Sequence, residues 1–178
     1  MTQSETVEVS DSIWLHRYYC EACLPHNASI VDAWNHLAED GCIRKTHFFH
    51  GRYENLYVNR DTLPGLEYIL DQALRFAAEI LCRPRSSLKI GFWLNVMREG
   101  EITSRHSHDD DDELLSGVYY VQVPEASGVF RCFNRDGNVS ITTNAGTFLF
   151  FDPGIEHEVT RHGAKQPRIS LGMNIGPA

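Results

Sequence analysis

The sequence predicts a mainly β protein with N-terminal helices and a jelly-roll, cupin-like core. The chain changes character near residue 88. Before that point the apolar patterns are mixed and partly helical, and after it short apolar runs alternate with turn signals, as in all-β proteins. The second half divides into eight such runs, which is the strand number of a jelly roll or a cupin-like barrel. We expect these strands at residues 89–98, 102–108, 115–123, 128–134, 139–142, 146–151, 157–161 and 167–175.

The N-terminal half predicts two helices and a short strand. Residues 64–81 place apolar side chains at helical spacing, Asp61 or Thr62 can cap that segment, and Pro64 suits its first turn. A second helix is expected at 29–39 and a strand at 52–59. No repeat or low-complexity linker divides the chain. We therefore expect one domain over residues 1–178, in which a helical part (1–87) packs on the β core (88–178).

Composition narrows the class of protein. The chain has 178 residues, of which 42% are hydrophobic and 22% charged, so it can bury a core of its own. The formal net charge of -8 argues against a nucleic-acid partner. No apolar run is long enough to span a membrane, and residues 1–10 lack the apolar stretch of a signal peptide. The five cysteines, an odd count, suit reduced thiols, and we expect a cytoplasmic protein.

The last expected strand separates two kinds of side chain. Because side chains alternate along a strand, one face carries only apolar residues and the other carries charge and hydrogen-bonding groups. The apolar face needs a hydrophobic partner, which the helix at 64–81 can supply. The polar face is typical of a cavity lining. The apolar set is Ile169, Leu171, Met173 and Ile175, and the other set is Arg168, Ser170, Gly172 and Asn174.

Three histidines are the candidate metal ligands. His106 and His108 lie two residues apart on one expected strand, so both imidazoles share a face. His157 follows a turn at the start of a later strand that can lie beside the first. Imidazole nitrogen binds iron, zinc, copper and nickel alike. An acidic run follows directly, and Asp109 or Glu113 is an alternative carboxylate ligand, since the usual non-haem iron site combines two histidines with one carboxylate.

A candidate anion site lies eleven residues beyond the last histidine. Arg168 follows His157 across a turn, and the two flanking runs can pair as a hairpin. An inward guanidinium can bind a small carboxylate through two hydrogen bonds, and Ser170 on the same face can donate a third. Asn95 offers an amide from the strand before the histidines. Tyr119 and Tyr120 are adjacent, so only one of them should face the cavity. We include Tyr120 among the candidate ligand-binding residues, together with Asn174.

These segments together resemble a family of 2-oxoglutarate- and Fe(II)-dependent oxygenases found in bacteria and phages. The resemblance covers about residues 90–176, roughly half of the chain. It is carried by WLNV at 93–96, Gly100, His106-Ser107-His108, LSGVYY at 115–120, GTFLFF at 146–151, His157 and the segment from Arg168 to Asn174.

The resemblance implies a double-stranded β-helix with Fe(II) as cofactor and 2-oxoglutarate and O₂ as co-substrates. The family pattern assigns His106 and His157 to the metal, and Arg168 with Ser170 to the C5 carboxylate of 2-oxoglutarate. The sequence departs from that pattern at His108, which stands where the family has an acid. Three alternatives remain open for the third ligand. His108 can bind the metal itself, it can lie beside the metal without binding it, or a carboxylate from Asp109 or Glu113 can be the ligand. The activity implied is hydroxylation of a small-molecule or peptide substrate, coupled to conversion of 2-oxoglutarate to succinate and CO₂.

Two other functions are consistent with parts of the sequence. A cupin-type metalloenzyme would bind its metal through His106, His108, Glu113 and His157, and it would have no need of Arg168. A non-catalytic β-helix module would bind a ligand without turnover. A zinc knuckle at Cys20 and Cys23 is disfavoured, because no second pair of this spacing completes four ligands.

Overall fold

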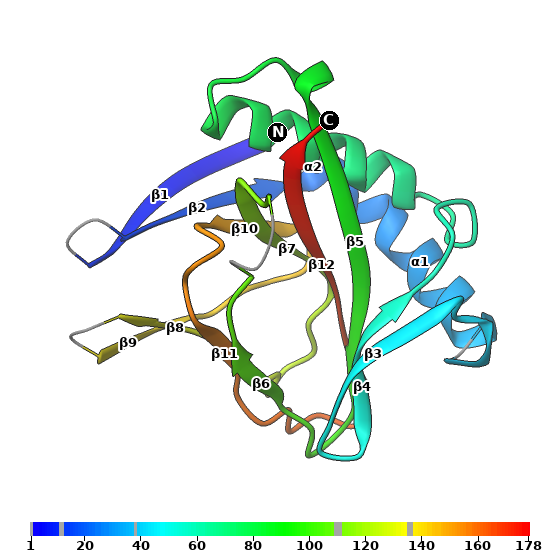
Figure 1. Cartoon of the computed structure of the whole chain (residues 1–178). Coiled ribbons are helices and arrows are strands. Elements are labelled where there is room, and N and C mark those ends of the chain that lie inside the picture. Colours follow the sequence, from blue (N-terminus) through cyan, green and yellow to red (C-terminus); the bar gives the residue numbers. More distant parts are fainter. Residues whose placement is uncertain (1, 11–12, 38, 109–111, 135–136) are drawn as a thin grey trace.

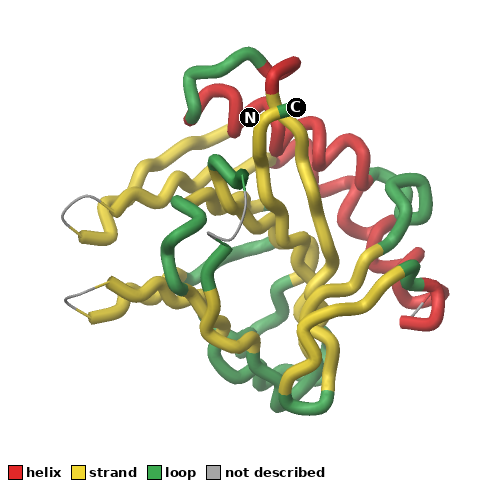
Figure 2. Tube along the Cα trace, in the orientation of Figure 1, coloured by secondary structure: helices red, strands yellow, loops and turns green. Residues whose placement is uncertain are grey.

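Two antiparallel β-sheets face each other, and two helices cover the outer side of the larger sheet (Figure 1). The computed structural model describes residues 2–10, 13–37, 39–108, 112–134 and 137–178. Figure 2 shows the helices gathered on one side and the strands of the smaller sheet on the other. None of the helices in the described ranges is long and apolar enough to cross a membrane.

The elements follow one another in the order strands, helix, strands, helix and then strands only. The helices are α1 (Leu24–Leu37) and α2 (Leu66–Ile80), with short 3₁₀ turns η1 (Glu21–Cys23), η2 (Glu39–Gly41) and η3 (Arg85–Ser87). The first four strands are β1 (Thr2–Ser10), β2 (Ile13–Cys20), β3 (Arg44–Phe49) and β4 (Arg52–Tyr57). The remaining strands are β5 (Leu88–Met97), β6 (Thr103–His106), β7 (Leu115–Gln122), β8 (Phe130–Asn134), β9 (Gly137–Ile141), β10 (Thr147–Phe151), β11 (His157–Val159) and β12 (Arg168–Pro177).

The eight strands of the second half confirm the predicted core. The larger sheet has the order β1-β2-β10-β7-β12-β5-β4-β3, and the smaller sheet has the order β6-β11-β8-β9. The chain passes back and forth between the sheets, so that β5, β7, β10 and β12 face β6, β8, β9 and β11. This arrangement is the double-stranded β-helix that the family resemblance implies.

The first 87 residues contribute more strand than the sequence indicates. Beyond the expected strand, which is β4, the structure adds β1, β2 and β3. Strands β1 and β2 extend one edge of the larger sheet, and β3 and β4 extend the other. The N-terminal half therefore widens the sheet in addition to packing helices on it.

The helix predicted at 64–81 is α2, and its start differs from the prediction by two residues. Gly65 precedes the helix with a φ of 88°, in the left-handed region, so the helix begins at Leu66. Neither Asp61, Thr62 nor any other side chain caps it. A Cβ atom at position 65 would lie 2.7 Å from the His26 ring, so glycine also permits the close approach to α1.

The two faces of β12 separate as alternation predicts. Its apolar side chains, Ile169, Leu171, Met173 and Ile175, are fully buried in one cluster with the inner face of α2. A second cluster lies between the two sheets and includes Met97, Tyr120, Phe130 and Phe151. The polar side chains of β12 point toward this second region, where the candidate site lies.

Candidate metal centre

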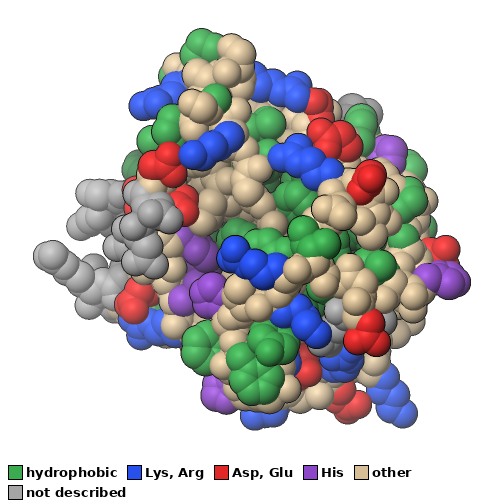
Figure 3. Space-filling model, turned by 45° about the vertical axis from the view of Figure 1, so that its right-hand side comes forward, with side chains coloured by type: hydrophobic (Ala, Val, Ile, Leu, Met, Phe, Trp, Pro, Cys, Tyr) green, Lys and Arg blue, Asp and Glu red, His purple; other side chains and the backbone are tan. Residues whose placement is uncertain are grey.

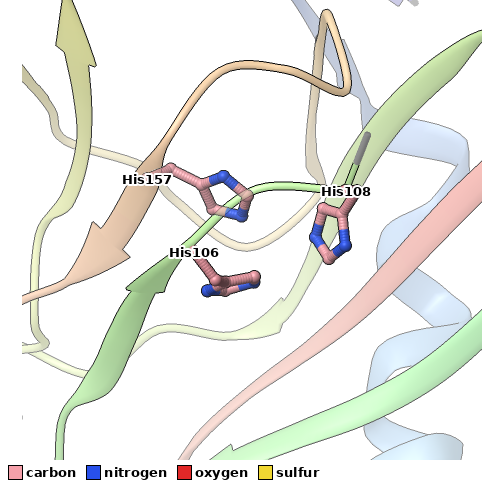
Figure 4. Close-up of side chains that lie close together, drawn as sticks. All are labelled: His106, His108 and His157. Atoms are coloured by element: carbon pink, nitrogen blue, oxygen red, sulfur yellow. The ribbon is translucent and has the colours of Figure 1, made fainter. Parts of the chain in front are cut away.

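The three predicted histidines meet between the sheets (Figure 4). His106 ends β6 and His157 begins β11, and the two are cross-strand partners. His108 lies just beyond β6, where its backbone N–H donates to the Pro153 carbonyl at 2.8 Å. One nitrogen from each ring lies within 4.8 Å of the others. In the part of the chain that the structure describes, no other group of three or more His, Cys, Asp or Glu side chains could hold a metal ion.

Backbone carbonyls fix the orientation of two of the rings. His106 Nδ1 lies 2.7 Å from the Ser104 carbonyl, and His157 Nδ1 lies 2.9 Å from the Ile155 carbonyl. Because a carbonyl only accepts, Nδ1 must carry the proton, which leaves Nε2 of both rings free as a ligand atom. Burial and the neighbouring His106 ring lower the pKa of His157 to about 3. His157 is thus a neutral imidazole at neutral pH, the form that binds metals.

Neither alternative carboxylate ligand is found in the histidine group of the described residues. Asp109 lies outside the described residues. Glu113 is not part of the histidine group, and its Oε1 accepts a hydrogen bond from Asn174 Nδ2 at 3.1 Å. Asn174 in turn accepts from the Ser116 hydroxyl at 3.0 Å. Glu113 and Asn174 therefore bond to each other near the far end of β12, and neither lines the pocket beside the histidines.

A pocket opens beside the histidines, with an empty volume of about 440 Å³ out to its mouth. Figure 3 shows histidine side chains at the wall of a hollow on this face of the molecule. The polar lining includes the three histidines together with Arg168, Ser170, Asn95 and Thr103. The remaining lining is apolar or glycine: Trp93, Gly117, Val118, Phe130, Phe151, Val159 and Gly172.

Arg168 is a buried cation at the base of this pocket. Its side chain is 1% exposed, and its guanidinium donates to Ser170 Oγ at 3.2 Å and to Met97 Sδ at 3.8 Å. Its Nε is buried with no hydrogen-bond partner, and no carboxylate among the described residues pairs with it. Burial lowers its pKa, against the opposing effect of Tyr120. A buried guanidinium without an acidic partner is costly, so this position calls for an anionic ligand.

The two tyrosines divide between the faces of the larger sheet. The Tyr120 ring lies under Arg168, with 4.9 Å between the guanidinium carbon and the ring centroid. Tyr119 points to the opposite side, where its hydroxyl donates to Asn27 Oδ1 at 2.7 Å. Tyr120 therefore supports the guanidinium from below and is not itself part of the pocket lining.

Asn95 lines the pocket but is already engaged. Its Oδ1 accepts from both terminal nitrogens of Arg52 at 3.4 Å, and its Nδ2 donates to Thr103 Oγ1 at 3.2 Å. No pattern in the sequence predicted Arg52 or Thr103 near the site. Arg52 and Glu54 share one face of a short strand. Two charged residues on one face ordinarily indicate a face exposed to solvent, so this pattern did not point to the site.

Cys20 and Cys23 are buried thiols in the core between the larger sheet and the helices. Neither belongs to a potential metal-binding group among the described residues. His47 and His50 are exposed on the β3–β4 hairpin, outside the histidine group. The metal-binding capacity of the described chain therefore concentrates between the two sheets.

Comparisons with known proteins bear on the family and the fold. The model of the family described as "Putative 2OG-Fe(II) oxygenase" matches residues 91–145. No curated protein matches the chain. The solved structures similar to it include the following three. A prolyl-4-hydroxylase from Pseudomonas putida is 22% identical, with 64% of this chain and 67% of that chain covered, at a TM-score of 0.53.

An oxidoreductase of the 2OG-Fe(II) oxygenase family from Burkholderia pseudomallei is 17% identical, with 98% of this chain and 73% of that chain covered, at a TM-score of 0.56. EvdO2 from Micromonospora carbonacea var. aurantiaca is 12% identical, with coverage of 99% and 95% and a TM-score of 0.68. At these identities the structural likeness shows the fold.

The fold and the histidine centre define a class, that of metal-dependent enzymes built on a double-stranded β-helix. Within that class, the family model that matches residues 91–145 and the shared fold support a 2OG-Fe(II) oxygenase, an oxidoreductase that would use Fe(II) and 2-oxoglutarate.

Proposed function

We propose that the protein hydroxylates a small molecule or a peptide, with Fe(II) bound by His106, His108 and His157 and 2-oxoglutarate bound by Arg168 and Ser170. One observation carries the co-substrate assignment. The Arg168 guanidinium, 1% exposed and unpaired with any described carboxylate, lies in the same pocket as the three histidines. A dicarboxylate that reaches from the metal to this guanidinium would neutralise it.

The donor set suits Fe(II) with three protein ligands. Two rings present Nε2 because their Nδ1 atoms are held by carbonyls, and the third ring lies with its centroid 4.8 Å from that of His106 and 5.2 Å from that of His157. Imidazole is a suitable iron ligand, and three protein ligands leave coordination positions for co-substrate and O₂. His108 then takes the place that an acid occupies in the family pattern.

When bound, Fe(II) and 2-oxoglutarate would supply the chemistry with O₂, which would give one oxygen atom to succinate, formed with loss of CO₂, and the other to a carbon of the substrate. The chain's own residues bind, orient and exclude water. Arg168 and Ser170 bind the distal carboxylate and so set the direction in which 2-oxoglutarate lies. Phe130, Phe151 and Val159 line the same pocket with apolar surface and keep water from the reacting groups.

Hydroxylation is the reaction we favour within the family. Two of the similar structures are prolyl hydroxylases, one from Pseudomonas putida and one from Trichoplax adhaerens, the latter bound to a peptide. The cupin alternative is less well supported, because it needs Glu113 at the metal and leaves Arg168 without a function. In the structure Glu113 bonds to Asn174.

The test is an anaerobic titration of the Fe(II)-loaded protein with 2-oxoglutarate, followed through the metal-to-ligand charge-transfer band in visible absorption. We expect a band with the wild type. His157→Ala should lose it by losing the metal. Arg168→Ala should keep the metal and weaken 2-oxoglutarate binding by about 100-fold, the loss expected for two hydrogen bonds to a charged group. Arg161→Ala, which removes an exposed arginine, is the matched control and should behave as wild type.

Each result that departs from these expectations leads to a different conclusion. Unchanged 2-oxoglutarate affinity in Arg168→Ala would contradict the assignment of the anion site. Metal binding by the wild type without any band would favour a cupin-type enzyme. No metal binding at all would favour a non-catalytic module.

A further inference from the structure

Strand β6, which carries His106, lies at the open edge of the smaller sheet (Figure 1). It pairs with β11 on one side only. The N–H and C=O groups on the free side of an edge strand need other partners, since buried backbone groups are almost always hydrogen-bonded. Two side chains from β4, a strand of the other sheet, bond to β6 and to the residue just before it.

Glu54 supplies the acceptor. Its side chain is 3% exposed, and its Oε1 accepts from both the backbone N–H and the hydroxyl of Ser104, each at 2.9 Å. The N–H and C=O of one residue in a strand point to the same edge. The carbonyl of Ser104 on that edge accepts from His106 Nδ1 at 2.7 Å. Glu54 and the ring of His106 therefore bind the same residue, Ser104, one through its N–H and hydroxyl and the other through its carbonyl.

Arg52 supplies the donors. It lies two residues before Glu54, on the same face of β4, and is 7% exposed. Its guanidinium donates to the Ile102 carbonyl at 2.7 Å and to Thr103 Oγ1 at 3.1 Å, just ahead of Ser104. It also donates to the Val96 carbonyl of β5 at 3.3 Å. Arg52 thus fixes the start of β6 to the larger sheet, while Glu54 fixes its middle.

The burial of both charged side chains indicates that their bonds to Ser104 and its neighbours have a function at the metal centre. Removing a carboxylate and a guanidinium from water is costly, and apolar residues would often give equal stability. Neither Arg52 nor Glu54 lines the pocket. Both act on the short strand that ends in a candidate metal ligand, where a displacement of about 1 Å can cost 100-fold in catalysis.

We propose that Glu54, assisted by Arg52, is a positioning residue for the metal centre. Glu54 bonds to a backbone N–H of β6 at Ser104, and Arg52 bonds to the Ile102 carbonyl just before the strand. By fixing the position of Ser104, Glu54 keeps the Ser104 carbonyl where it accepts from His106 Nδ1, which leaves Nε2 facing the metal. This inference rests on the proposed function, because it takes His106 as a metal ligand.

The first measurement is a Co(II) titration of the metal-free full-length protein, followed by the visible absorption of bound Co(II). Glu54→Ala should weaken Co(II) binding by about 10- to 100-fold, as loss of outer hydrogen-bond partners of metal ligands typically does. Glu54→Gln should stay within about threefold of wild type, because its amide oxygen can still accept both bonds. Glu67→Ala removes an exposed carboxylate that pairs with Arg60, and this control should change nothing.

The second measurement needs no metal. Long-range ¹H–¹⁵N spectra of the histidine rings report the tautomer of His106. We expect a single Nδ1-protonated form in wild type and Glu54→Gln, and a mixture of tautomers in Glu54→Ala. A general loss of packing would not shift one ring selectively, so the tautomer of His157 serves as the internal reference.

The outcomes separate this inference from the proposed function. A wild type that shows the single His106 tautomer but binds no Co(II) would overturn the metal site and leave the hydrogen bonds at Ser104 standing. Co(II) affinity and a His106 tautomer in Glu54→Ala that match wild type would overturn the positioning role. Equal losses in Glu54→Ala and Glu54→Gln would also overturn it, since charge rather than the acceptor bonds would then be responsible.

Discussion

At the scale of single residues, one glycine determines the shape of the pocket wall beside His108. Gly172 on β12 is the cross-strand partner of Trp93 on β5. A Cβ atom at position 172 would lie 2.4 Å from Trp93 Cε2, so the indole ring lies directly across the glycine. The same ring is centred 5.4 Å from the ring of His108. The absence of a side chain at 172 thus lets the indole lie against the sheet beside the candidate metal centre.

We predict that Gly172→Ala displaces the Trp93 ring toward His108. Overpacking of this kind costs about 1–3 kcal/mol, so the free energy of unfolding should fall by that amount. Tryptophan fluorescence should change, and Trp93→Phe in the same background should abolish the change. Gly91→Ala is the control, two pairs along the same two strands, because its Cβ would meet nothing closer than 4.0 Å. Equal effects of the two glycine substitutions would contradict the close packing of Trp93 on Gly172.

Alternation along strands predicted several site residues, and local irregularity limited the rest. The sequence placed Arg168 and Ser170 on one face of the last strand, and both line the pocket. The sequence could not predict which of Tyr119 and Tyr120 faces the pocket, because this depends on how β7 is paired with β12. That pairing is irregular between Ile169 and Ser170.

At the scale of elements, α2 stabilises the sheet that carries Arg168. Phe76 in this helix is 1% exposed and stacks on Tyr18 of β2, with ring centroids 4.3 Å apart. It also meets the edge of Phe148 of β10 at 5.3 Å. The helix therefore joins strands that are neighbours in the sheet but far apart in sequence.

We predict that Phe76→Ala lowers the free energy of unfolding by about 3–5 kcal/mol, the usual cost of deleting a buried aromatic ring. Urea denaturation followed by circular dichroism measures it. Glu79→Ala, on the exposed side of the same helix, should change stability by less than about 0.5 kcal/mol. A cost below about 1 kcal/mol for Phe76→Ala would show that the helix is not tightly packed on the sheet.

Elements with one apolar face were predictable, and elements at the sheet edges were not. Helix α2 shows helical periodicity because it buries one face, and strands such as β10 stand out as short apolar runs because they are buried at every position. Strand β1 reads as a polar segment because it lies at the edge of the larger sheet, and residues 2–6 are exposed. Strand β4 carries Arg52 and Glu54 inward, which reverses the ordinary pattern of charge facing solvent. Their partners, on β6 and just before it, lie about 50 residues away in sequence, and no local pattern predicts them.

At the scale of the whole molecule, the proposed ligands would join the two sheets. His106 and His157 belong to the smaller sheet, whereas Arg168 belongs to the larger one. A metal with 2-oxoglutarate attached would therefore bridge the two sheets across the pocket. Ligands that bind only the folded state raise its stability in proportion to the logarithm of their concentration over Kd.

We therefore predict that metal and 2-oxoglutarate stabilise the entire fold, and that they do so in a fixed order. Saturation with Fe(II) at about 100 times Kd should add about 2.7 kcal/mol. For a chain of this length that amounts to a rise in Tm of about 5–10 °C in anaerobic thermal unfolding, reversed by a chelator. 2-Oxoglutarate should raise Tm further only when metal is present, since one end of it binds the metal. His157→Ala should abolish both rises, and Arg168→Ala only the second. A rise with 2-oxoglutarate in the metal-free protein would mean that the arginine alone binds it and that no bridge between the sheets is needed.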